Sequence, residues 1–184
     1  MEALLQEQSE DAPVELHWRS FELRPKNAPP ISDEYRAQIE QSRPRLYGIA
    51  KERYGIDMNP GPFGFDSRPA LIGAKVADAA GKGLAYNRRI LNAYWEEAAD
   101  IEDRDALADL AVEAGLDRDA FLAGLDDPTF INQVDHDILL ARQYGLNGVP
   151  AIVFDNQFLV SGAQPLDVLR QALAQVREQE NGEA

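Results

Sequence analysis

The chain has 184 residues, with 18 basic and 32 acidic side chains, so its formal net charge is −14 at pH 7. This acidic balance argues against nucleic acid or a membrane surface as a partner, because both are negatively charged and would repel the chain. The sequence contains no cysteine, which excludes disulfides, thiolate metal ligands and a cysteine nucleophile within it.

Apolar residues make up 45% of the chain, enough for a packed core in one domain or in a small domain with an insertion. No stretch approaches the roughly 18 apolar residues of a membrane-spanning helix. The opening residues MEALLQEQSED have neither a basic start nor an apolar core, so they do not resemble a signal peptide. We therefore expect a cytoplasmic protein.

The first 30 residues predict the end of a helix and then one strand. Residues 1–8 carry Leu4 and Leu5 among Glu and Gln with no helix start signal ahead of them, so we expect the chain to begin within a helix. Apolar and polar residues largely alternate in VELHWRSFEL (residues 14–23), the period expected of a β-strand. NAPP (residues 27–30) predicts a loop.

Helical patterns dominate the segment from residue 31 to residue 128. A first helix starts at Ser32, and Pro44 predicts a break or a first-turn position in it. Further helices are predicted over residues 67–81, 84–98, 103–114 and 117–124. The loop NPGPFGF (residues 59–65) carries Phe63 and Phe65 beside glycines.

The last third predicts a long helix over residues 128–144, a β-hairpin and a final helix that starts at Pro165. The first strand of the hairpin is AIVF (residues 151–154), and the second covers residues 157–160. Pro150 stands directly before the first strand, although proline has no N–H to donate to a ladder. Either the strand lies at an edge, or a cis proline holds backbone open for a guest.

Strands at both ends of a helical block must pair with each other to bury their faces, which predicts an α/β domain with an all-helical lid. Several stretches also resemble the DsbA-like thioredoxin family, and within it the FrnE-like branch, which is related to 2-hydroxychromene-2-carboxylate isomerases. They are the final helix and the segments WRSFELRP (residues 18–25), YNRRILNAYWEEAADIEDRDALADLAVEAGLD (residues 86–117) and GVPAIVFDNQFLVSGAQP (residues 148–165).

The resemblance implies an α/β thioredoxin-like fold that lacks its N-terminal strand and carries an all-helical insertion. Residues 1–30 and 129–184 would form the discontinuous thioredoxin-like domain, and residues 31–128 the insertion. In such proteins the proline is cis, faces a CxxC motif, and follows a backbone segment that pairs with an extended substrate peptide. The resemblance carries substrate binding to Gly148, Val149 and Pro150, with the Val149 side chain expected in the core.

In the family, the helical insertion overhangs the redox centre. The resemblance therefore makes Phe63 and Phe65 candidate linings of a substrate groove, and the alternative is that the two rings pack beneath the lid. The family's first strand and CxxC are absent from this sequence. Three explanations compete: a longer natural protein with an upstream start, which we favour; pairing with a second copy as a homodimer, or rearrangement; and a degenerate relative.

The leading hypothesis is a DsbA/FrnE-type thiol-disulfide oxidoreductase or isomerase that is inactive as given, because it has no CxxC. Its expected partner is an extended peptide or protein disulfide, and no catalytic residue is assigned. One alternative is a peptide-binding module without chemistry. The other is a glutathione-dependent isomerase relative, in which bound glutathione supplies the sulfur; no other cofactor is expected.

Other polar motifs predict no site. His136 has only adjacent acidic neighbours, which point in different directions on a helix, and His17 is expected to be a half-exposed strand residue. The acidic run from Asp100 to Asp109 lacks the glycine and the spacing of a calcium loop. Ser161 has no nucleophile motif around it. We therefore expect no metal site.

Overall fold

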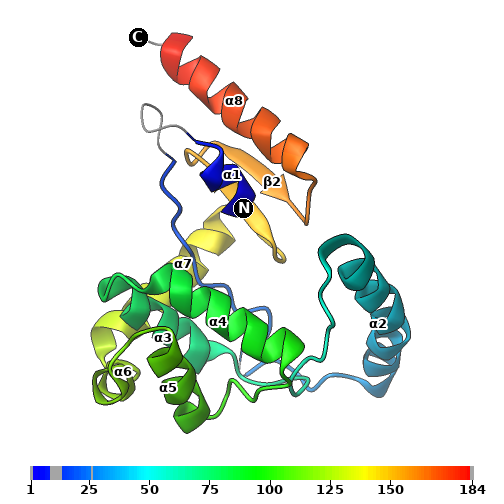
Figure 1. Ribbon diagram of the computed structural model, residues 1–184, viewed down its shortest axis with the longest axis vertical. Helices are drawn as coiled ribbons and strands as arrows, with labels where there is room; N and C mark the ends of the chain where they lie inside the picture. Colours follow the sequence, from blue (N-terminus) through cyan, green and yellow to red (C-terminus); the bar gives the residue numbers. More distant parts are fainter. Residues whose placement is uncertain (1, 9–13, 26, 183–184) are drawn as a thin grey trace. The chain divides into compact units, whose positions relative to one another are not determined.

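The computed structural model describes residues 2–8, 14–25 and 27–182 (Figure 1). It divides into two compact units, one formed by Met1–Arg19 with Leu140–Ala184 and the other by Ser20–Leu139. Residues 20–30 and 129–139, which the sequence prediction gave to the thioredoxin-like domain, are grouped with the helical unit. Polar contacts explain this grouping, because Ser20 and Glu22 bond to residues of helices in that unit.

The helical unit consists of five helices and the larger part of a sixth (Figure 1). They are α2 (Asp33–Tyr54), α3 (Arg68–Ala79), α4 (Gly83–Glu96), α5 (Arg104–Glu113), α6 (Arg118–Gly124) and α7 (Pro128–Gln143), which continues into the other unit. Capping side chains fix where several of these helices begin: the Ser32 side chain accepts from Tyr35 N at the start of α2, and the Asp117 side chain accepts from Ala120 N at the start of α6. The helices expected between residues 31 and 144 are confirmed, with ends shifted by a few residues.

Pro44 lies inside α2, which runs through it for 22 residues. None of the residues of α2 is buried, so the carbonyl group that loses its partner at the proline can be hydrated instead. The break predicted at this position is therefore wrong. The helix ends at Gly55, whose positive φ of 70° lets its N–H bond back to Lys51 O.

Aromatic and aliphatic side chains from α3 to α7 form the core of the helical unit. Its largest fully buried side chains are Tyr86, Phe121, Leu107 and Val134. The Tyr86 and Phe121 rings lie 5.6 Å apart, and the Tyr86 hydroxyl donates to Ala70 O. Gly73 is required beneath them, because an added Cβ would lie 2.3 Å from the Tyr86 hydroxyl oxygen.

The predicted strand over residues 14–23 is wrong, since these residues form no ladder hydrogen bonds. Polar contacts hold the second half of the segment instead: Ser20 N donates to the Asp137 carboxylate at 2.8 Å, and Glu22 pairs with Arg68 at 2.7 Å. Trp18, within the same segment, is 40% exposed. An alternating segment forms a strand only when a neighbouring strand pairs with it, and the described part of the chain has no strand beside residues 14–23.

The second unit contains a two-stranded antiparallel sheet with α1 (Glu2–Gln6), α8 (Leu166–Gly182) and the end of α7. Its strands are β1 (Ala151–Phe154) and β2 (Phe158–Ser161), with Ala151 opposite Ser161 and Phe154 opposite Phe158. Asp155 and Asn156 both have positive φ, as the tight turn of a hairpin requires. The predicted hairpin is confirmed, with the second strand one residue later than expected.

A small apolar cluster holds α1, the hairpin and α8 together. Its buried members are Leu4, Phe154, Leu169, Ala172, Leu173 and Val176. At its edge, the Arg170 guanidinium on α8 pairs with Glu7 at 2.5 Å and with Asp167 at 2.5 Å. Within the described ranges, no helix of either unit combines the length and the apolar character that crossing a membrane requires.

Candidate functional site

The segment of residues 148–150 leads into β1 and is open to solvent. The Val149 side chain is 59% exposed, Pro150 is exposed, and an added Cβ at Gly148 would meet nothing within 4 Å. The expectation that Val149 packs in the core is therefore wrong, because no side chain of the described residues covers this stretch closely. The peptide bond between Val149 and Pro150 is cis.

The register of the hairpin decides which backbone groups of β1 remain available. Gly162 N donates to Pro150 O at 2.8 Å, which makes Pro150 and Gly162 a hydrogen-bonded pair in line with the register of the strands. Such pairs alternate along an antiparallel ladder, so Ile152 and Phe154 also bond toward β2. Ala151 and Val153 consequently direct their N–H and C=O groups away from β2.

The backbone N–H and C=O groups on the outer edge of β1 therefore have no strand to bond to in the part of the chain that the structure describes. Within residues 2–8, 14–25 and 27–182, β1 pairs with β2 alone. An unpaired row of N–H and C=O groups is the template on which an extended peptide adds as a further strand. Chemically, the site offers hydrogen bonds from the Ala151 and Val153 backbone, with the exposed Val149 next to them in sequence.

Phe63 and Phe65 lie in the helical unit. The loop that carries them is tied to the end of α4: Asn59 N donates to Trp95 O and Gly61 N to Tyr94 O, both at 2.7 Å. Gly61 has to be glycine at this close approach, because an added Cβ would lie 2.2 Å from Ala99 O. The sequence places the aromatic pair on a loop, and these contacts fix the conformation of that loop.

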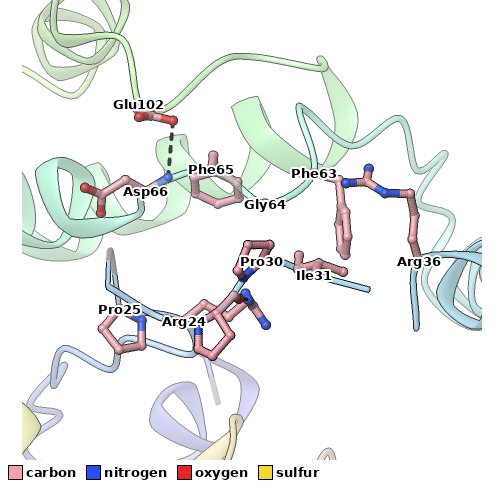
Figure 2. Close-up of a pocket in the computed structure, with 12 residues that line it drawn as sticks. Arg24, Pro25, Pro30, Ile31, Arg36, Phe63, Gly64, Phe65, Asp66 and Glu102 are labelled. Atoms are coloured by element: carbon pink, nitrogen blue, oxygen red, sulfur yellow. Dashed lines mark hydrogen bonds between the residues drawn. The ribbon is translucent and has the colours of Figure 1, made fainter. Parts of the chain in front are cut away.

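Both rings line a pocket of about 310 Å³ (Figure 2). Phe65 packs against the Tyr94 ring at 4.7 Å, while Phe63 lies beside two guanidinium groups, those of Arg36 at 5.4 Å and Arg43 at 5.6 Å. Burial raises the pKa of the Tyr94 hydroxyl, and the nearby Arg43 opposes this shift. The hydroxyl donates to Pro62 O and so helps to hold the loop.

The arginines of this pocket were not among the site residues predicted from the sequence. Arg24 and Arg36 line it, and Arg43 reaches Phe63 from the same helix as Arg36. The spacing of seven residues between Arg36 and Arg43 in a predicted helix was an available signal, since it puts both on one face. No sequence signal connected that face to a phenylalanine 20 or more residues away.

The remaining polar candidates form no further site. His17 pairs with Glu15 at 3.2 Å, and both side chains are largely exposed. In the part of the chain that the structure describes, no three His, Cys, Asp or Glu residues come together as a possible metal site.

The β-hairpin followed by α8, with a helical unit inserted ahead of it, defines an α/β protein of the thioredoxin-like class. The model of the DSBA-like thioredoxin domain family matches residues 1–174. The chain therefore belongs to the DsbA-like thioredoxin family, which confirms the family and the fold class expected from the sequence.

Similar proteins support this assignment. Bacillus subtilis YwbO is 29% identical over 170 residues, which span 88% of this chain and 82% of that protein. A probable DsbA oxidoreductase from Streptomyces coelicolor superimposes with a TM-score of 0.78 and 29% identity, covering 95% of this chain and 80% of that one. A 2-hydroxychromene-2-carboxylate isomerase shares the fold, with a TM-score of 0.68, 23% identity, and coverage of 86% and 76%.

Proposed function

We propose that this chain is the substrate-holding part of a DsbA-type thiol-disulfide oxidoreductase and that it binds an extended polypeptide along β1. The observation that carries the proposal is the outer edge of β1, where the outward N–H and C=O groups of Ala151 and Val153 face no further strand among the described residues. The exposed Val149 extends this surface toward Gly148. Family membership and the similarity to a probable DsbA oxidoreductase favour a polypeptide disulfide as the substrate.

The binding step follows from ladder geometry. A guest in extended conformation would accept from the N–H groups of Ala151 and Val153 and donate to their carbonyl groups, as in strand addition. The main chain of the guest makes these bonds, so they tolerate many sequences. Specificity would then come from side chains beside the strand, with Val149 the exposed apolar contact at its start.

The chemical step needs a thiolate from outside these residues. Thiol-disulfide exchange begins when a thiolate attacks a disulfide sulfur, and this chain has no cysteine to form one. The attacking thiolate would therefore belong to another molecule or to polypeptide beyond these 184 residues. The same absence favours a second candidate, a module that binds peptides without redox chemistry.

A proline substitution tests the binding edge directly. Val153→Pro removes an outward N–H and leaves the hydrogen bonds between β1 and β2 in place, because Val153 lies opposite Leu159 in a non-hydrogen-bonded pair. The probe is reduced, carbamidomethylated insulin B chain with a fluorescent label, followed by anisotropy. We expect saturable binding to the unsubstituted chain and about tenfold weaker binding to the variant.

Leu159→Pro is the matched control, since it removes the outward N–H from the opposite edge of the same hairpin. This control should bind the probe within about twofold of the unsubstituted chain. Equal weakening by both substitutions would contradict strand addition at β1, as would the absence of saturable binding. Circular dichroism of both variants checks that the hairpin and α8 still form.

A further inference from the structure

A pocket in the helical unit combines apolar walls with charged groups (Figure 2). It is lined by residues 24–25 and 28–31, by Arg36 of α2, by residues 63–66 and by Glu102. Its volume of about 310 Å³ is at the small end of the range for ligand pockets, which is about 300–1,000 Å³. The residues that matter for its chemistry are Arg24, Pro30, Ile31, Arg36, Phe63 and Glu102.

Two cations line this pocket without forming ion pairs. Neither Arg24 nor Arg36 has a carboxylate within ion-pair distance among the described residues. Carboxylates are abundant in this chain, with 32 acidic against 18 basic residues. Other arginines use them, as Arg89 does with Glu97 and Glu113. The positive charge in the pocket is therefore available to a ligand.

Contacts within the pocket hold both guanidinium groups in place. Arg24 donates a hydrogen bond to Pro29 O, across the loop on which it lies. Arg36 lies over the Phe63 ring at 5.4 Å, and Figure 2 shows its side chain directed toward that ring. Donors that are held before binding lose less conformational entropy when a ligand arrives.

The apolar walls are fixed as well. Phe63 is carried by the loop that hydrogen bonds to the end of α4, and Phe65 is packed against Tyr94. Ile31 lies close to Gly64, since an added Cβ there would be 3.4 Å from Ile31 Cδ1. Phe63, Phe65 and Ile31 therefore present apolar surface to the pocket from segments that are held in place.

We propose that this pocket binds a small organic carboxylate. Its carboxylate group would pair with Arg36, whose planar guanidinium group matches a carboxylate in geometry and charge. Arg24 would add positive charge to the same pocket, and the apolar body of the ligand would contact Phe63 and Ile31. Asp66 and Glu102 also line the pocket, so a second negative charge on the ligand would be repelled. This favours a monoanion over a phosphate or phosphonate dianion, and it does not depend on the function proposed above.

Isothermal titration calorimetry of the full chain with 3-phenylpropionate tests the site. We expect saturable binding with a stoichiometry of one and a Kd in the millimolar range or below. Arg36→Gln should weaken binding about tenfold, because it removes one charged donor from the exposed start of α2 without touching the core. Arg45→Gln is the matched control, because it removes the same charge from an exposed position on the same helix, outside the pocket.

Two ligand analogues complete the test. Neutral 3-phenylpropanamide should bind at least tenfold more weakly than the acid, and 2-phenylethylphosphonate, measured at pH 8.5 as the dianion, should not bind more tightly than the acid. The proposal is overturned if the acid shows no saturable binding up to about 10 mM, roughly ten times a millimolar Kd. Equal affinity for the amide, tighter binding of the phosphonate, or equal weakening by Arg45→Gln would overturn it too.

Discussion

At the residue scale, the contact with the largest cost of desolvation is the buried ion pair between Lys75 on α3 and Asp137 on α7. Their exposed fractions are 6% and 2%, so both charges have left water. The Asp137 carboxylate also accepts from Ser20 N, which fixes the segment that enters the helical unit. A charge buried to this degree is tolerated only when it is neutralised and hydrogen bonded.

Asp137→Asn should lower the free energy of unfolding by about 3–5 kcal/mol, because it removes the negative charge that neutralises the Lys75 ammonium in the interior. Urea unfolding followed by circular dichroism measures the change. Replacing both partners, Lys75→Met with Asp137→Leu, should recover part of the loss, since no buried charge then remains. A single substitution that costs less than about 1 kcal/mol would show that the pair does not support the fold in this way.

At the element scale, α1 and α8 are joined by apolar packing and by the ion pair between Glu7 and Arg170. Hydrogen bonding from the Arg170 guanidinium holds the pKa of the Glu7 carboxyl below its ordinary value, against the opposing effect of desolvation. A folded-state pKa below the unfolded one means that the charged carboxylate stabilises the folded chain. This contribution is present above pH 4.5 and disappears as the pH falls through the lowered pKa.

Glu7→Gln should therefore destabilise the chain near pH 7, and its difference from the unsubstituted chain should vanish in acid below the lowered pKa of Glu7. Urea midpoints measured between pH 3 and pH 7 follow this convergence. Glu178→Gln removes the same charge from an exposed position on α8, the helix that carries Arg170, and should give a small difference that does not converge in this way. A Glu7→Gln deficit that persists unchanged below the lowered pKa would rule out the ion pair as its cause.

At the scale of the whole molecule, the feature that limits activity is composition. The chain folds as a DsbA-like thioredoxin protein with a helical insertion, yet none of its 184 residues is a cysteine. Under the proposed function, binding and chemistry are separable in this chain. The edge of β1 would hold an extended substrate, whereas exchange would require a thiolate from another molecule or from polypeptide beyond these 184 residues.

The chain alone should not accelerate the reduction of insulin by dithiothreitol, because only the added reductant provides a thiolate. Turbidity from the precipitating insulin B chain measures the rate, with a cysteine-containing thioredoxin as the positive control. The rate should equal the background rate without protein at every chain concentration. Acceleration that scales with the concentration of the chain would refute the proposed division between binding and chemistry.

The sequence by itself determined the family, most of the helices, the hairpin and the absence of a thiol. These depend on composition and on signals a few residues apart, such as the cap at Ser32 and the turn at Asp155 and Asn156. The tertiary structure alone decided that residues 14–23 form no strand, that Val149 is exposed, and that Arg24 and Arg36 share a pocket with Phe63. Ser20 and Asp137 illustrate the reason, since a hydrogen bond across 117 residues depends on the whole path of the chain, which no local pattern specifies.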